Sequence, residues 1–182
     1  MINNLYIPNY IQLPVLGKLY LGGYYIDENP YLLDNLKELN IDIIFSLGVF
    51  INKLKVSPFL SLNIKLYSFD IEDMKDIETQ YEMNDIINYI LPLLDKGLKE
   101  GKCVYICCEA GISRSSTIII SYLMEYFSYS LIEAIDYIKL FRPQIYPNIG
   151  FRKLLEIRER INYLNKRYYK NLIFIIIYNK IK

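Results

Sequence analysis

The 182-residue chain contains no histidine and no tryptophan, and its three cysteines all lie between positions 103 and 108. The absence of histidine excludes Ser-His-Asp and Cys-His catalysis and the usual histidine-containing zinc sites. Cysteines so close together cannot link distant parts of a fold, which favours a reducing compartment such as the cytoplasm. Any catalysis therefore has to use cysteine, carboxylate, lysine or arginine side chains.

An excess of charge of one sign is also missing, because 21 Lys+Arg stand against 20 Asp+Glu. This balance indicates neither a nucleic-acid partner nor an anionic membrane. The first residues, MINNLYIPNY, have no basic-then-apolar signal pattern. With 53% hydrophobic residues, the sequence predicts a single globular domain without a transmembrane segment.

The strongest chemical signal lies in residues 102–127, KCVYICCEAGISRSSTIIISYLMEYF. A short apolar run leads into a compact loop, residues 108–114, and then directly into an apolar segment of helical length. This order predicts a strand, a loop and a helix N-terminus, whose unpaired backbone N–H groups can bind an anion. Arg114 adds a planar fork of donors that suits two phosphate oxygens. The stretch therefore predicts a site for a phosphate-sized dianion.

Cys108 stands six residues before Arg114, and neither Cys103 nor Cys107 has an arginine at that spacing. Loop dipoles and a guanidinium favour the thiolate, which is the nucleophilic form of cysteine. Ser115 offers a hydroxyl that can stabilise a departing thiolate. Without its neighbours, the Cys-x5-Arg pair is better explained as a buried cysteine and an arginine that begins a helix.

The whole window CEAGISRSS resembles the signature loop of the cysteine-dependent protein tyrosine phosphatase superfamily, and AGISRS is most similar to the dual-specificity branch. The resemblance implies that Cys108 is the nucleophile, that Arg114 binds phosphate and that Ser115 assists breakdown of a phosphocysteine. It implies neither a metal nor another cofactor, because the loop itself supplies positive electrostatics. The expected phosphate-binding residues are Glu109, Ala110, Gly111, Ile112, Ser113 and Arg114.

One position departs from the family pattern. The family has a histidine just before the nucleophile, and this chain has Cys107 there. The residue at that position supports the loop and tunes the thiolate, so the change bears on the rate more than on the kind of chemistry. It also motivates an alternative function, a phosphopeptide-binding protein with weak catalysis.

A general acid is expected after the strand in IKLYSFDIED, because release of an alcohol of high pKa requires a proton donor. The resemblance places this acid at Asp73. The family's usual proline is replaced by Asp70, and the spacing from Asp73 to Cys108 is a few residues longer than usual. Asp70 and Asp76 therefore remain alternatives for the acid.

Hydrophobic periodicity predicts an α/β domain with a mostly parallel central sheet and helices on both faces, and the pattern resembles the dual-specificity phosphatase fold. Residues 1–17 are expected to form an irregular arm or an edge strand. Strands are expected at 18–22, at 41–48, from 64 and at 104–107, and helices at 32–39, 77–98, 114–127, 131–141 and 151–163. A capping box is expected at Ser130 and Glu133.

The segment RPQIYPNIGF resembles the family turn that packs near the phosphate loop, so Asn148 is either a loop brace or a plain turn residue. Residues 1–165 are predicted to form the catalytic domain, and residues 166–182 an apolar tail of unassigned role. The apolar run at 172–178 is expected to pack on the domain. Weak self-association and contact with a membrane surface are the alternatives.

These features predict a cytoplasmic protein phosphatase that acts on phosphotyrosine and on phosphoserine or phosphothreonine. Its expected partner is a phosphoprotein rather than nucleic acid. Phosphoinositide and RNA 5′-phosphate are alternative substrates. The variable loop positions Glu109 and Ile112 add no cation, which favours a phosphoprotein.

Overall fold

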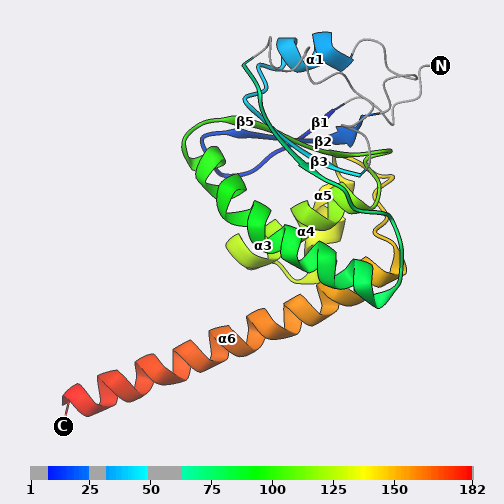
Figure 1. The fold of residues 1–182 in the computed structure, drawn as a ribbon. Helices are drawn as coiled ribbons and strands as arrows, with labels where there is room; N and C mark the ends of the chain where they lie inside the picture. The colour runs from blue at the N-terminus through cyan, green and yellow to red at the C-terminus, as the bar shows by residue number, and fades with distance from the viewer. Residues whose placement is uncertain (1–7, 25–31, 49–62, 182) are drawn as a thin grey trace.

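The computed structural model describes residues 8–24, 32–48 and 63–181. Its strands form one sheet in the order β1-β2-β5-β3-β4 (Figure 1). β1 pairs antiparallel with β2, and every other neighbouring pair is parallel. The predicted parallel sheet and edge strand are therefore confirmed. The bounds are Asn9–Ile11 for β1, Lys18–Gly23 for β2, Ile43–Leu47 for β3, Lys65–Phe69 for β4 and Cys103–Cys108 for β5.

Helices lie on both sides of this sheet, with α1 on one side and α3 to α6 on the other (Figure 1). α5 begins with the predicted capping box, in which the Ser130 and Glu133 side chains each bond the backbone of the other residue. α3 continues through Pro92 without ending there. The bounds are Leu32–Glu38 for α1, Ile77–Lys99 for α3, Arg114–Tyr126 for α4, Leu131–Lys139 for α5 and Ile149–Ile181 for α6.

β5 is the central strand, and its side chains alternate between two buried clusters. Val104, Ile106 and Cys108 belong to the cluster on the α3 and α4 side, whereas Tyr105 and Cys107 belong to the α1 side. A strand buried on both faces has a continuous apolar sequence, as CVYICC does. Because ligands bind outside the carboxyl ends of parallel strands, the residues that follow β5 occupy the expected position of a site.

α6 differs from the prediction, because its expected end near residue 163 is wrong. The helix continues to Ile181 and runs away from the rest of the domain (Figure 1). No glycine or proline occurs after residue 150, so nothing in the sequence stops propagation of the helix. Phe151 and Leu155 are buried, whereas Leu164 and Tyr168 are exposed.

The run at 172–178 was expected to pack on the domain. Its side chains lie outside the described part of the molecule, because the side chains of α6 are described only up to residue 168. Within the part that is described, no helix is both long and apolar enough to cross a membrane.

Candidate active site

The loop of residues 109–113 joins the end of β5 to the first turn of α4. Gly111 has a φ of +66°, and a Cβ atom there would lie 2.4 Å from the carbonyl carbon of Gly22 in β2. Only glycine fits such a close approach of two backbones. The backbone N–H of Tyr24 donates to the carbonyls of Cys108 and Glu109, at 3.1 and 3.2 Å. Gly22 in β2 and Tyr24, just after β2, therefore hold the beginning of the loop and its turn at Gly111.

The loop has the backbone geometry of an anion site. Within the described part of the chain, the N–H groups of residues 109–114 donate to no protein acceptor. Ser113, the N-cap of α4, makes no side-chain capping bond. N–H groups left unpaired at a helix N-terminus bind anions well, because the helix dipole adds to their hydrogen bonds.

Cys108 lies at the base of this loop and is 2% exposed. Its Sγ is 3.1 Å from the Oγ of Ser115, which is fully buried. A hydroxyl at this distance can donate a hydrogen bond to a thiolate.

Cys107 points to the opposite face of the sheet and interacts with β3 instead of the loop. Its Sγ donates to the Phe45 carbonyl at 3.7 Å. Burial raises the pKa of the Cys107 thiol, and the neighbouring Cys108 adds to this effect. Cys107 therefore stays a neutral thiol within the core. It links β5 to β3 and makes no bond to the phosphate loop in the described part of the chain.

The three nitrogen atoms of Arg114 have different surroundings. Nη1 donates to the Ile71 carbonyl at 3.0 Å, and Nη2 donates to Oε2 of Glu109 at 3.3 Å. Nε has no hydrogen-bond partner among the described residues and lies 3.9 Å from Oδ2 of Asp73. Gly48 leaves room for this side chain, because a Cβ there would be 2.5 Å from Nη1. Nη1 anchors the guanidinium, and the Nε–Nη2 edge can meet a phosphate.

Asp73 lies beside the loop, 40 residues from Ser113 in sequence. Its Oδ1 accepts from Ser113 Oγ at 2.7 Å and from Asn148 Nδ2 at 2.5 Å. The backbone N–H of Asn148 also donates to Ser113 Oγ at 3.0 Å. Asn148 therefore links the Asp73 segment to the phosphate loop, which a plain turn residue does not do. The Asp73 side chain is 35% exposed and remains accessible to a substrate.

The two alternative carboxylates have other surroundings. Asp76 is the N-cap of α3 and accepts from the N–H and the hydroxyl of Thr79. The bond from the Thr79 backbone, followed by that from its hydroxyl, lowers the pKa of Asp76, whose carboxylate caps α3 and makes no bond to the phosphate loop among the described residues. Asp70 is exposed and makes no bond to the phosphate loop within the described residues. The geometry favours Asp73 among the three.

Arg142 belongs to the site although the sequence indicated only the end of a helix there. It is fully buried, and its Nε and Nη2 donate to the carbonyls of Gly111 at 2.7 Å and Ala110 at 2.9 Å. Its Nη1 donates to Oδ1 of Asn9 at 2.5 Å. Arg142 thus holds two loop carbonyls on the side away from the N–H groups. In the sequence, only the Arg-Pro pair of the segment RPQIYPNIGF, which resembles the family turn, pointed to this position.

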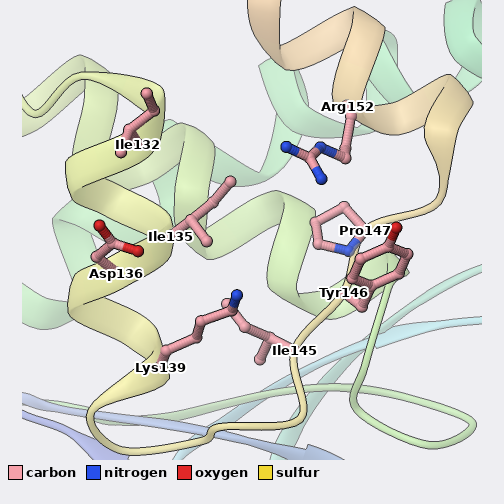
Figure 2. A pocket seen from close by; sticks show the side chains of 8 residues that line it. All are labelled: Ile132, Ile135, Asp136, Lys139, Ile145, Tyr146, Pro147 and Arg152. Carbon is pink, nitrogen blue, oxygen red and sulfur yellow. The ribbon is translucent and has the colours of Figure 1, made fainter.

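Two hollows border these residues. One, of about 190 Å³, lies between α5 and the segment that enters α6. Figure 2 shows Ile135 and Lys139 of α5 on one wall and Tyr146 and Arg152 on the other. The Tyr146 N–H donates to the Ile112 carbonyl at 2.9 Å, so this wall supports the phosphate loop from outside. No cysteine lines this hollow.

The other hollow is open and has a volume of about 740 Å³, and Asp73 is one of the residues that line it. Met74 and Ile149 contribute exposed apolar surface to it. A substrate whose phosphate enters the loop can therefore place neighbouring atoms against this surface. Its lining consists of Asp73, Met74, Lys75, Asp76, Asn148 and Ile149.

The central strand of this mostly parallel sheet ends at a cysteine, and an N–H-lined loop and an arginine follow it. This combination defines a phosphatase of the cysteine-dependent class. Residues 19–160 match the model of the dual specificity phosphatase catalytic domain. The chain therefore belongs to the dual specificity phosphatase family, as the signature loop predicted.

Similar proteins are consistent with this assignment. The chain is 34% identical over 141 residues to MAP kinase phosphatase with leucine-rich repeats protein 3 of Dictyostelium discoideum, covering 78% of this chain and 15% of that one. It is 32% identical over 165 residues to human dual specificity protein phosphatase 5, covering 88% and 40%. It thus spans less than half the length of these two relatives.

Among solved structures, human tyrosine phosphatase-like serine/threonine/tyrosine-interacting protein superposes with a TM-score of 0.66 at 28% identity. The match covers 86% of this chain and 97% of that structure. It confirms the predicted α/β architecture.

Proposed function

We propose that this chain hydrolyses phosphate monoesters on proteins, at phosphotyrosine and also at phosphoserine and phosphothreonine, through a phosphocysteine intermediate. One observation carries the proposal. The Cys108 sulfur lies 3.1 Å from the Ser115 hydroxyl, at the base of a loop whose N–H groups have no acceptor in the described part of the protein. Nucleophile, anion cradle and leaving-group stabiliser are thus in one place.

In the first step, the Cys108 thiolate attacks phosphorus and forms a P–S bond while the P–O bond to the substrate breaks. The N–H groups of residues 109–114 and the Arg114 edge hold the phosphoryl oxygens as charge develops on them. Asp73 gives its proton to the departing oxygen, which leaves as a neutral alcohol.

In the second step, water attacks the phosphocysteine, and the Asp73 carboxylate accepts a proton from that water. The P–S bond breaks, inorganic phosphate forms, and Cys108 leaves as a thiolate. The Ser115 hydroxyl stabilises this thiolate by donating a hydrogen bond. Atoms and charge balance without an oxidant, a reductant or a metal.

A protein substrate is supported by the surroundings of the loop. Glu109 and Ile112 add no cation, whereas a substrate with several phosphates would be bound best by further lysines or arginines. Met74 and Ile149 offer apolar surface beside the acid, where a peptide side chain can pack. We accordingly expect a phosphoprotein substrate. The close spacing of the three cysteines favours a reducing compartment, the cytoplasm.

The test compares Asp73→Asn with Asp76→Asn on a phosphotyrosine peptide, with EDTA present. Loss of the proton donor is expected to lower kcat by roughly 100- to 10,000-fold in Asp73→Asn. Asp76→Asn, which changes a helix cap, should retain nearly full kcat.

Equal losses in the two variants would contradict the role of Asp73. A folded wild-type protein that binds the peptide without hydrolysing it would instead establish the alternative function, phosphopeptide binding, which Cys107 in place of the family histidine suggests.

A further inference from the structure

The phosphate-facing edge of Arg114 is already partly paired within the chain. Nη2 donates to Glu109, while Nε lacks a hydrogen-bond partner in the described part of the chain, although the side chain is only 8% exposed. The Ile71 carbonyl holds Nη1, which leaves the Nε–Nη2 edge as the edge that can bind two phosphate oxygens. Because Nη2 already pairs with Glu109, a phosphate on this edge lies beside the Glu109 carboxylate, and repulsion between the two anions favours displacement of the carboxylate.

Glu109 can make this movement, because its side chain is 53% exposed, whereas Arg114 is fixed by burial. Glu109 follows the nucleophile directly, so its Cα stays in the loop when the carboxylate turns away. The displaced charge then lies at the mouth of the site, close to the bound dianion. Bringing a dianion here costs free energy unless the substrate supplies a cation nearby.

We propose that Glu109 is a specificity-determining residue that competes with the phosphate group for Arg114 and thereby selects phosphopeptides with a basic residue beside the phosphorylated one. This inference rests on the proposed function of the loop as a phosphate site. In the free protein, the carboxylate pairs with the guanidinium. In the complex, the same carboxylate pairs with the lysine or arginine of the substrate. When free phosphate or a peptide with acidic neighbours binds, the pair between Glu109 and Arg114 is broken. No pair between Glu109 and a substrate cation replaces it.

Binding alone tests the proposal, so its outcome is independent of turnover. All variants are made in the Cys108→Ser background, and calorimetry measures the Kd of inorganic phosphate. Glu109→Gln is expected to bind phosphate about two- to fivefold more tightly, the factor for an ion pair at a partly exposed site. Glu109→Asp keeps the charge but is one methylene shorter, and we expect part of the same gain.

Glu72→Gln is the matched control, because it removes an exposed carboxylate that precedes Asp73 in sequence and is not paired with Arg114 in the described structure. It should change phosphate affinity less than Glu109→Gln does. An unchanged or weaker Kd in Glu109→Gln would overturn the proposal, as would equal gains in the two variants. Circular dichroism melts confirm that each variant is folded.

A second arm measures two phosphotyrosine peptides that differ only in a lysine or a glutamate beside the phosphotyrosine. The protein with Glu109 should prefer the lysine peptide, and Glu109→Gln should reduce that preference about two- to fivefold. A preference that survives the substitution intact would overturn the proposal. If the peptides bind as expected but wild-type protein shows no turnover, the proposed hydrolysis fails while this inference stands.

Discussion

The contact between the Cys108 sulfur and the Ser115 hydroxyl bears on the second chemical step more than on the first. A hydrogen bond to a thiolate stabilises it, which helps the sulfur to leave but does not strengthen its attack. At 3.1 Å and in a buried site, the hydroxyl is placed for this role. The residue is thus expected to control how long the phosphocysteine persists.

Ser115→Ala should therefore slow hydrolysis of the intermediate while leaving its formation largely intact. Loss of a hydrogen bond to a charged group costs about 1.5–3 kcal/mol, or roughly 10- to 100-fold in kcat. Rapid-mixing kinetics with para-nitrophenyl phosphate should show a burst of one product equivalent followed by slow turnover. A uniform decrease without a burst would place the effect of Ser115 in the first step instead.

At the scale of elements, the phosphate loop depends on the segment between α5 and α6. Arg142 binds two loop carbonyls, the Tyr146 N–H binds a third, and Asn148 joins the loop to Asp73. Burial lowers the pKa of Arg142, but an arginine in this position still carries its charge. The loop conformation is therefore specified largely by residues that follow it by 30 positions or more.

Arg142→Met should remove these bonds and leave the carbonyls of Ala110 and Gly111 without the arginine donors. We expect a loss of about 2–5 kcal/mol in the free energy of unfolding, measured by urea denaturation. Phosphate affinity should fall as well, because the loop is no longer held. Arg160→Met, an exposed change on α6, is the control and should alter stability by about 0.5 kcal/mol or less.

A stable Arg142→Met protein with unchanged phosphate affinity would show that the loop is held without Arg142. That outcome would assign the loop conformation to the bonds of Tyr24, Tyr146 and Asn148 and to the close contact of Gly111 with Gly22.

Local patterns in the sequence were sufficient to predict the sheet, the main helices and the loop between Cys108 and Arg114. Apolar periodicity and Cys-x5-Arg spacing are properties of neighbouring residues. Arg142 bonds the loop from about 30 positions away in sequence, and Asn148 bonds Asp73 from 75 positions away. Spacing between neighbouring residues could not reveal these bonds. The Glu109 contact depends on a side-chain conformation, which no pattern encodes.

At the scale of the whole molecule, α6 passes from the buried core of the domain to an exposed stretch. Phe151 and Leu155 of α6 are buried in the core, whereas residues 163–168 are all exposed. Among the described residues of that stretch, Lys166 donates to Ser128 Oγ at an exposed position. We accordingly retain residues 1–165 as the proposed catalytic domain and residues 166–182 as a tail.

A chain that ends at residue 165 should therefore fold and unfold cooperatively. We expect its free energy of unfolding to lie within about 1 kcal/mol of the full chain, because exposed contacts contribute little. Its kcat on a phosphotyrosine peptide should be unchanged. A large loss of either quantity would mean that the tail belongs to the domain, and sedimentation of both chains would show whether the tail mediates self-association.

Whether this chain is a cysteine phosphatase depends above all on the formation of a phosphocysteine at Cys108. Wild-type protein and Cys108→Ser are mixed with para-nitrophenyl phosphate in EDTA, quenched in acid and examined by mass spectrometry. We expect one phosphate on the wild-type peptide that contains Cys108, and neither label nor turnover in Cys108→Ser. Turnover that survives in Cys108→Ser, or hydrolysis by the wild type that EDTA abolishes, would contradict the proposed function.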